Sequence, residues 1–450
     1  MASTSSPSSS SGRVPSSILI IGGGVFGLST AWALCNNPDF KDTSITLIDR
    51  LPFPTTDGSS IDASRIIRPD YAAAPYAKLA AIAQEKWRTD FAPEHYHQTG
   101  LCVTAAGPEQ KYVSASLANV QALGVDKVEV LQSSEDIKRV CGLEATGPTG
   151  AGNVGYVNWS SGWANAEGGM RWLRKKLEAL NRVNFVVGKV ASLAIDHQTS
   201  SISGATLSDS THITADLTIL AAGAWSASLL DLRGICKATG QALCYMPISA
   251  SEESTLSTRP TLLNLSNGLF MIPPANGLLK VARHGHGYTN PTTIRHPESE
   301  DPNATITVSL PYTHIDDPNL TVPVEAHRSC RDFLANIHPS LAIPSRPFTQ
   351  SKICWYTDTR DGDFLISYHP KYKGLFVATG GSGHGYKFLP VIGECIVNCV
   401  MGRTPEDFKE RWAWPQQRVP EEQWSGDGSR GGPVGMVLKE ELGKGRRANL

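Results

Sequence analysis

The sequence predicts an α/β (α+β) fold in which a Rossmann-like dinucleotide-binding domain is interleaved with a β-sheet-rich second domain. Three features indicate this class. An apolar strand at residues 17–21 leads directly into a glycine-rich turn from Gly22 to Gly27. A second strand ends in Asp49, and a further strand at residues 217–221, more than 170 positions later, also ends in small residues. Such a late return of the chain favours two interleaved lobes over three consecutive domains.

Strands and helices alternate along the chain. Short apolar runs predict buried strands, and longer stretches with helical periodicity predict helices. The expected strands are residues 17–21, 45–48, 183–187, 217–221 and 375–378. The expected helices are residues 28–34, 76–89, 168–180 and 391–401. The region from about 230 to 350 is richer in Thr, Ser and Pro and is the candidate for a separate substrate-facing layer.

Composition limits the classes of function. The 450 residues include 41 Lys and Arg against 42 Asp and Glu, so the net charge of −1 argues against partners such as nucleic acid or an anionic membrane. The longest apolar candidate for a membrane span, residues 18–34, is interrupted by four glycines. Nine cysteines without CxxC pairs argue against a disulfide framework and against a metal site.

The two ends differ from the body of the chain. Residues 1–15 are almost entirely small and polar and predict a disordered Ser-rich leader, and residues 416–450 are polar and Gly-rich and predict a flexible tail. The segment Ala448-Asn449-Leu450 is similar to the S-K-L peroxisomal address, although asparagine replaces the basic middle residue. We therefore expect delivery to the peroxisome through its import receptor, and a cytoplasmic protein otherwise.

The glycine-rich turn predicts a nucleotide site. Gly22 permits a tight turn, Gly24 lets the backbone approach a pyrophosphate, and Gly27 lets the helix pack against the strand. The unpaired N–H groups at the start of the helix, at Val25 and Phe26, attract the phosphates.

Asp49 supports the same site. It lies 22 positions after Gly27, where an acidic residue accepts hydrogen bonds from the adenosine ribose, and Arg50 follows it directly. An acid at this position repels a 2′-phosphate, so an unphosphorylated ribose is expected. These residues are compatible with either FAD or NAD.

Five separated motifs follow in order within residues 17–415. They are DASRIIRPDY at 62–71, GAW at 223–225, GLLKVARH at 277–284, CWYTDTRDGDFLI at 354–366 and GSGHGYKF at 381–388. In these motifs the chain resembles the flavin-dependent amine oxidases of the monomeric sarcosine oxidase family, which also contains pipecolate, saccharopine and fructosyl amino acid oxidases. The resemblance implies FAD rather than NAD.

The resemblance also implies an architecture like that of D-amino-acid oxidase. The FAD-binding domain would be discontinuous and comprise residues 16–90, 150–235 and 350–410. The substrate domain would comprise residues 91–149 and 236–349. Because the chain shows no coiled-coil heptads or other interface marker, a monomer is expected.

Single residues match functional positions of the family. Cys354 matches the cysteine that attaches the flavin through a thioether to its 8α carbon, so a covalent cofactor is implied. Contacts with the cofactor are further implied for Ser64, Gly383, Gly385 and Lys387.

Further matches concern catalysis. Lys280 matches a lysine that lies near flavin N5 through a water and assists reaction with O2, because a fixed ammonium stabilises the negative charge that oxygen acquires. Arg68 and Lys387 match a pair that holds the substrate carboxylate. Arg65 and His284 match further active-site neighbours.

These matches imply oxidation of a secondary amine, with hydrolysis of the resulting imine and reduction of O2 to H2O2. Sarcosine, N-methyl amino acids, pipecolate, saccharopine and fructosyl amino acids are all compatible substrates. Ala413 stands where fructosyl enzymes carry a substrate-contacting arginine, which argues against a bulky glycated substrate. The same residues are also compatible with an amine dehydrogenase that uses a protein acceptor, with a flavin oxidase of secondary-metabolite biosynthesis and with a non-catalytic flavin-binding protein.

Overall fold

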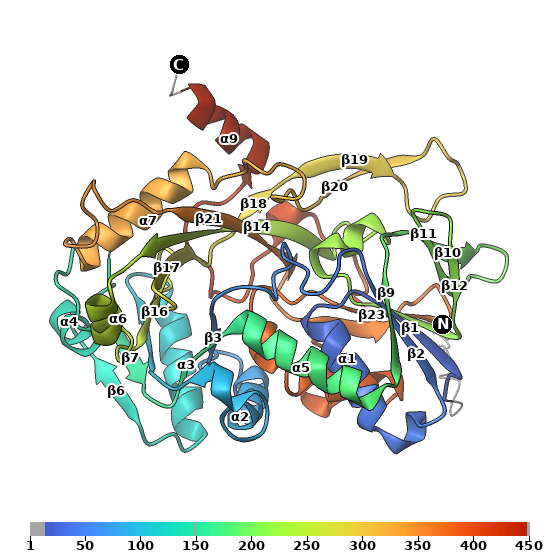
Figure 1. Ribbon diagram of the computed structural model, residues 1–450, viewed down its shortest axis with the longest axis horizontal. Helices are drawn as coiled ribbons and strands as arrows, with labels where there is room; N and C mark the ends of the chain where they lie inside the picture. The colour runs from blue at the N-terminus through green and yellow to red at the C-terminus, as the bar shows by residue number, and fades with distance from the viewer. Residues whose placement is uncertain (1–13, 148–149, 448–450) are drawn as a thin grey trace, which may run out of the picture.

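Two large sheets organise the protein in a computed structural model that describes residues 14–147 and 150–447. Figure 1 shows strands β1 and β2 with helix α1 toward one end of the molecule, and strands β16 and β17 with helices α6 and α7 toward the other. The expected leader falls almost entirely on residues 1–13, outside the described residues.

The first sheet has six strands, and the chain enters it from both ends of the sequence. Its order is β22 (Leu365–Tyr368), β23 (Leu375–Thr379), β13 (Leu217–Leu220), β1 (Ser17–Ile21), β2 (Ser44–Asp49) and β9 (Val183–Val187). All neighbours are parallel except β22, which pairs antiparallel with β23. The five strands expected from apolar runs all lie in this sheet, so these predictions are confirmed.

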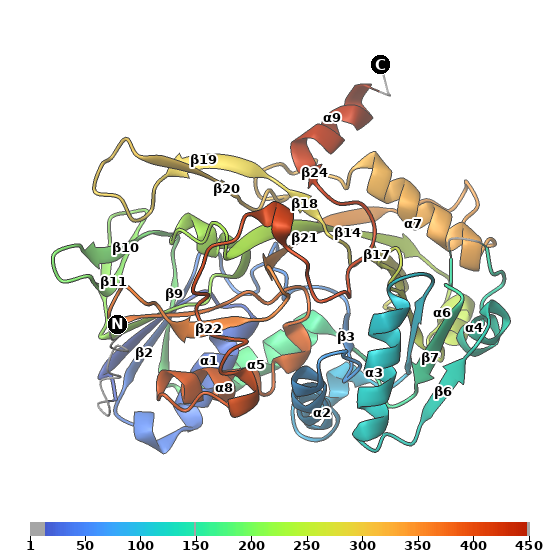
Figure 2. The same cartoon turned by 180° about the vertical axis from the view of Figure 1, so that it is seen from behind.

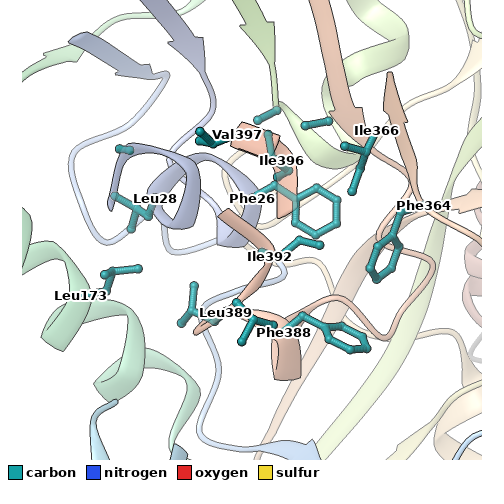
Figure 3. Packing of buried hydrophobic residues seen from close by; sticks show 14 of the residues in the cluster. Phe26, Leu28, Leu173, Phe364, Ile366, Phe388, Leu389, Ile392, Ile396 and Val397 are labelled. Atoms are coloured by element: carbon teal, nitrogen blue, oxygen red, sulfur yellow. The ribbon is translucent and has the colours of Figure 1, made fainter. Parts of the chain in front are cut away.

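Helices cover this sheet and bury its apolar side chains. Three of them are α1 (Val25–Asn36), α5 (Ala166–Leu180) and α8 (Ile392–Val400). The Asn165 side chain caps α5 by accepting a hydrogen bond from the Gly168 amide at 2.8 Å. Figure 3 shows Phe26 of α1 and Ile392 of α8 within one apolar cluster.

Helices α1 and α8 approach each other closely at Ser29 and Gly393. The Ser29 hydroxyl donates a hydrogen bond to the Leu389 carbonyl at 2.8 Å and accepts one from the Gly393 amide at 2.8 Å. A Cβ atom at position 393 would lie 1.8 Å from the Ser29 carbonyl oxygen. The close contact therefore requires glycine.

The second sheet has ten strands and runs through most of the other half of the molecule. Its order is β24 (Met436–Val437), β18 (Tyr288–Thr289), β14 (Cys236–Pro247), β17 (Leu278–Arg283), β16 (Leu269–Ala275), β15 (Thr261–Asn264), β5 (Leu101–Ala105), β7 (Val154–Asn158) and β6 (Val128–Leu131), and β21 (Gln350–Thr359) also pairs with β14. The expected boundaries placed β7 and β21 in the FAD-binding domain, but both strands hydrogen-bond into this second sheet.

Smaller elements complete the fold. The remaining strands form the sheets β10 (Val190–Asp196), β11 (Ser201–Leu207) and β12 (His212–Thr214); β19 (Pro291–Arg295) and β20 (Thr305–Ser309); and β3 (Arg65–Ile67), β8 (Gly162–Ala164) and β4 (Tyr96–His97). The remaining helices are α2 (Ala74–Thr89), α3 (Gln110–Ala122), α4 (Ser134–Cys141), α6 (Ala250–Leu256), α7 (Val324–Ile337) and α9 (Leu438–Arg447).

The segment after residue 415 differs from the expected flexible tail. Figure 2 shows it running from the region of α8 back across the molecule to β24 and α9. Strand β24 pairs with β18, and Leu438 is fully buried, so a few anchoring contacts order a segment that lacks an apolar period. Residues 448–450 lie outside the described part, and the peroxisomal address stays a prediction.

Within residues 14–147 and 150–447, no helix combines the length and the apolar character needed to span a lipid bilayer.

The contact between α1 and α8 yields a stability prediction. We expect Gly393→Ala to lower the free energy of unfolding by about 1–3 kcal/mol, the usual cost of overpacking, as measured by urea denaturation. Gly443→Ala is the matched control, because no atom lies within 4 Å of a Cβ atom there and alanine favours the helix. Equal stability of Gly393→Ala and the parent protein would contradict this contact.

Candidate active site

The glycine-rich turn after β1 combines two crowded glycines with one open glycine. Gly22 has a φ of 110°, and a Cβ atom on it would lie 2.4 Å from the Ala221 carbonyl oxygen. A Cβ atom on Gly27 would lie 1.8 Å from the Gly22 carbonyl oxygen. Gly24 has only the Ser60 hydroxyl nearby, at 3.9 Å, so its backbone faces open space at the N-terminus of α1.

Asp49 and Arg50 lie beside this turn at the end of β2. The Asp49 carboxylate accepts a hydrogen bond from the Gly23 amide at 2.7 Å. Burial raises the pKa of Asp49, and the Gly23 hydrogen bond and the Arg50 cation oppose that shift. Arg50 forms an ion pair with Asp57, and its guanidinium carbon lies 4.1 Å from the centre of the Trp225 ring.

We call the space bounded by this turn, Asp49 and residues 221–225 the nucleotide cleft. It has an empty volume of about 1360 Å³ and extends to Tyr356 and Gly383. An open glycine backbone and a helix N-terminus suit a pyrophosphate, and the Asp49 carboxylate suits a ribose. The length of the cleft beyond the turn leaves room for a group larger than a mononucleotide, so the residues present fit FAD.

A second space, which we call the inner cavity, adjoins the nucleotide cleft. It has an empty volume of about 660 Å³ and is lined by both Arg68 and Lys280. Arg65, Tyr356 and other residues line both the cleft and the inner cavity, so the two spaces meet there.

The buried Asp62 carboxylate connects the two spaces. It accepts hydrogen bonds from the Lys280 ammonium at 2.5 Å and from the Tyr245 hydroxyl at 2.5 Å, and it forms an ion pair with Arg65. Lys280 also donates to the Ser64 carbonyl at 2.9 Å. Burial and the Arg65 cation lower the pKa of Lys280, whereas the Asp62 carboxylate favours the ammonium form.

Cys354 lies in β21, directly opposite Gln241 of β14, and is buried. Arg65 Nη2 lies 3.3 Å from Cys354 Sγ and also donates to the Ser59 carbonyl at 2.7 Å. Arg65 therefore links the Asp62 carboxylate to the Cys354 sulfur.

Arg68 and Lys387 form a second cationic group in the inner cavity. The Arg68 Nη1 atom is buried and has no hydrogen-bond partner among the described residues. Lys387 donates hydrogen bonds to the Tyr71 hydroxyl at 2.8 Å and to the His384 carbonyl at 2.9 Å. Burial lowers the pKa of Lys387, and the Arg68 cation lowers it further.

Two histidines in the inner cavity are neutral near pH 7. Burial lowers the pKa of His284 well below its usual range and that of His384 to about 3. The His384 Nε2 atom lies 2.9 Å from the Gly362 carbonyl and therefore carries the proton, so Nδ1 accepts from the Tyr71 hydroxyl at 2.8 Å. This fixed imidazole orients the hydroxyl that receives the Lys387 hydrogen bond.

The structure divides the site residues expected from the sequence between the two spaces. The nucleotide cleft is lined by Gly22, Gly24, Val25, Phe26, Asp49, Arg50, Gly383 and Gly385. The inner cavity is lined by Ser64, Arg68, Lys280, His284, Gly383 and Lys387. Arg65 lines both, Gly27 lies behind the turn, and Cys354 contacts the site through Arg65.

Sequence reasoning missed several residues of the site. Asp62 and Tyr71 stood within the motif at residues 62–71, and that motif was the only sequence signal for Asp62, because its partner Lys280 lies 218 positions away. Arg430 comes from the segment expected to be a tail, where no local pattern pointed to it. It donates hydrogen bonds to the Asp358 carboxylate at 2.6 Å and to the Gly285 carbonyl at 2.8 Å.

Comparison with known proteins identifies the family. The model of the FAD dependent oxidoreductase family matches residues 17–398, so the chain belongs to this family. Amino acid oxidase imqH of Aspergillus flavus is 33% identical over 473 residues, which cover 89% of this chain and 98% of that protein. L-saccharopine oxidase of Schizosaccharomyces pombe is 31% identical over 425 residues, which cover 90% of this chain and 95% of that protein.

Solved structures agree with this assignment. The crystal structure of fructosyl amine:oxygen oxidoreductase (Amadoriase I) from Aspergillus fumigatus has a TM-score of 0.78 and 27% sequence identity, and the match covers 94% of this chain and 96% of that chain. The expected family resemblance, the FAD cofactor and the architecture of a Rossmann-like sheet plus a sheet-rich domain are therefore confirmed.

The Asp62 cluster yields a second stability prediction. We expect Asp62→Asn to lower the free energy of unfolding by about 3–5 kcal/mol, because Lys280 and Arg65 would lose the carboxylate that balances their buried charges. Urea denaturation of parent and variant with the same FAD content measures this effect.

The matched control is Asp407→Asn, which removes an exposed carboxylate 3.8 Å from Lys78. An exposed pair contributes little to stability, so this variant should unfold as the parent protein does. Equal effects of the two substitutions would show that Asp62 does not balance buried charge.

Proposed function

We propose that the protein oxidises a secondary amine that carries a carboxylate, an N-substituted amino acid, with FAD as cofactor and O2 as electron acceptor. The observation that carries this proposal is the pair of buried cations, Arg68 and Lys387, in a cavity that adjoins the nucleotide cleft. Neither has a carboxylate within 4.0 Å among the described residues. A guanidinium beside an ammonium suits a carboxylate ligand, which it would hold and orient.

The inner cavity also favours a neutral amine. None of the described residues that line it is an aspartate or a glutamate, so an ammonium group would find no counterion there. The carboxylate of Asp62, which binds Lys280 at the edge of the cavity, is already paired with Lys280 and Arg65. A neutral amine keeps the nitrogen lone pair that assists loss of hydride from the adjacent carbon.

The reaction balances as a two-electron oxidation. The amine loses a hydride from carbon and a proton from nitrogen, and water hydrolyses the resulting imine to a carbonyl compound and an amine. Bound FAD supplies the acceptor of the two electrons and their donor to O2. O2 takes up these two electrons and two protons and becomes H2O2.

Lys280 would serve the oxygen half of the reaction. Its ammonium lines the inner cavity and is fixed by Asp62 and the Ser64 carbonyl. A fixed positive charge in a site without bulk water stabilises the negative charge that develops on O2. Because Asp62 favours the ammonium form, this charge is available despite burial.

Kinetics with an N-methyl amino acid test the function and the role of Lys280 together. The substrate should bleach the flavin anaerobically and release H2O2 in air. We expect Lys280→Met to leave anaerobic bleaching nearly intact and to slow reoxidation by about 100-fold or more, as measured by stopped-flow absorbance.

Lys352→Met is the matched control, because Lys352 is a half-buried lysine that donates hydrogen bonds to the Thr56 and Ile61 carbonyls and lines neither space. If Lys280→Met is reoxidised as fast as this control, Lys280 has no part in the oxygen reaction. If bleaching occurs but no peroxide forms, an amine dehydrogenase with a protein acceptor is the better assignment.

We further infer that Cys354 binds FAD covalently. The support is the contact between its sulfur and Arg65, whose guanidinium lines both the nucleotide cleft and the inner cavity. A cysteine sulfur fixed beside a cation at this junction is placed to form a thioether with the 8α carbon. The thiol and the 8α methyl group would each lose a proton, and the two electrons released would reduce the flavin and pass on to O2.

Acid precipitation tests the covalent bond. The parent protein should keep the yellow colour in the pellet, and Cys354→Ala should release it to the supernatant. Cys236→Ala is the control, because Cys236 is also buried but lies at the start of β14, opposite Thr359, whereas Cys354 lies opposite Gln241 and contacts Arg65. Release of all colour from the parent protein would contradict the tether.

A further inference from the structure

One wall of the inner cavity is a face of the ten-stranded sheet. Alternate side chains of a strand point to the same face. The residues that reach the cavity in this way are Gln241 and Leu243 of β14, Phe270 and Ile272 of β16, and Lys280 and Ala282 of β17, together with Leu263 of β15. The apolar members of this wall are Leu243, Leu263, Phe270, Ile272 and Ala282. Cross-strand pairing places Ala282 opposite Leu243 on one side and Phe270 on the other, so the apolar side chains form a continuous surface.

The polar residues on the same wall already have partners. Arg283 of β17 also lines the cavity, and its guanidinium is paired with the Glu325 carboxylate. Lys280 is bound by Asp62, and the Gln241 side chain accepts a hydrogen bond from the Gly285 amide at 3.0 Å and donates one to the Thr239 hydroxyl at 3.4 Å. His284 is neutral, because burial lowers its pKa. The sheet wall therefore offers a ligand apolar surface and no unbalanced charge.

The two available cations come from elements outside this sheet. Arg68 follows β3, and Lys387 lies in the short helix η4 (Tyr386–Phe388). Both lie near one aromatic ring: the Arg68 guanidinium carbon and the Lys387 ammonium are each 5.1 Å from the centre of the Tyr71 ring. Both side chains also line the inner cavity, and the Arg68 charge acts on Lys387, so a carboxylate bound in the cavity lies near both.

We infer that the substrate is an N-alkyl α-amino acid with one carboxylate and an apolar side chain. The inference rests on the proposed function and specifies the substrate class of the same site. The carboxylate pairs with Arg68 and Lys387, and the side chain packs on the apolar wall around Leu243, Phe270 and Ile272. A substrate with a second carboxylate or a sugar would place polar groups against this wall and lose their hydration without gaining hydrogen bonds.

A homologous substrate series tests the inference. In sarcosine, N-methyl-L-alanine, N-methyl-L-2-aminobutyrate and N-methyl-L-norvaline, the side chain grows by one carbon at a time. We expect kcat/KM for peroxide release to rise about four-fold per added carbon, the factor that corresponds to the free energy of burying one methylene group. Saccharopine and fructosyl glycine should react about 100-fold or more slowly than N-methyl-L-norvaline. The inference would be overturned if kcat/KM stayed constant or fell along the series, or if saccharopine or fructosyl glycine reacted faster than N-methyl-L-norvaline.

A binding measurement separates this inference from the proposed function. Pentanoate and glutarate lack the amine and cannot be oxidised, and they differ by a second carboxylate. We expect pentanoate to perturb the flavin absorbance of the holoenzyme at concentrations at least ten-fold lower than glutarate does. If none of the amines bleaches the flavin, the proposed function fails. The comparison of pentanoate with glutarate still shows whether the cavity binds an apolar chain more tightly than a second carboxylate. Tighter binding of glutarate would overturn the inference.

Two adjacent leucines provide a matched pair of variants. Leu262 and Leu263 are both buried in β15, but only Leu263 lines the inner cavity. Both alanine variants should lose stability to a similar extent. Only Leu263→Ala should flatten the increase in kcat/KM along the substrate series. If kcat/KM rises per added carbon as steeply in both variants as in the parent protein, the substrate side chain does not pack on this wall.

Discussion

A single buried carboxylate joins the two halves of the site. Asp62 lies in the loop before β3, whereas Lys280 and Tyr245 are cross-strand neighbours on the ten-stranded sheet. Arg65 shares the same carboxylate and reaches the Cys354 sulfur. One carboxylate thus pairs with both the buried Lys280 and the partly buried Arg65, and such pairing favours the charged form of a buried lysine. The positions of the proposed oxygen-activating lysine and of the proposed flavin tether depend on this one group.

The charges of Arg68 and Lys387, which Asp62 does not balance, define which ligands the inner cavity can bind. Arg68 and Lys387 have no carboxylate within 4.0 Å among the described residues, and the opposing sheet presents apolar side chains such as Phe270. A ligand must therefore supply an anion and can bury apolar surface. Burial and the Lys387 charge keep His384 neutral against the opposing effect of its hydrogen bond to the Gly362 carbonyl, so this side chain adds no positive charge to the cavity.

Much of the nucleotide-binding half could be predicted from the sequence. The strand β1, the turn at Gly22 and the acid Asp49 follow from apolar runs, backbone conformation and short spacing, which are local properties. The inner cavity was accessible only through resemblance to a family, since no local pattern distinguishes Arg68 from a surface arginine. No sequence pattern indicated Arg430, because its segment is polar and Gly-rich. Tertiary contacts order this segment, among them the contact of Arg430 with Asp358 and the pairing of β24 with the edge of the large sheet.

The sequence by itself determined a parallel sheet with a glycine-rich turn and an acidic second strand, because hydrophobic periodicity and the need for a positive φ at Gly22 are encoded within a few residues. Only the tertiary structure decided that β7 and β21 belong to the ten-stranded sheet and that the Asp62 cluster exists. Arg65 is a local partner of Asp62, three positions along the chain, but Tyr245 and Lys280 lie 183 and 218 positions away, so the complete cluster depends on how distant strands pair.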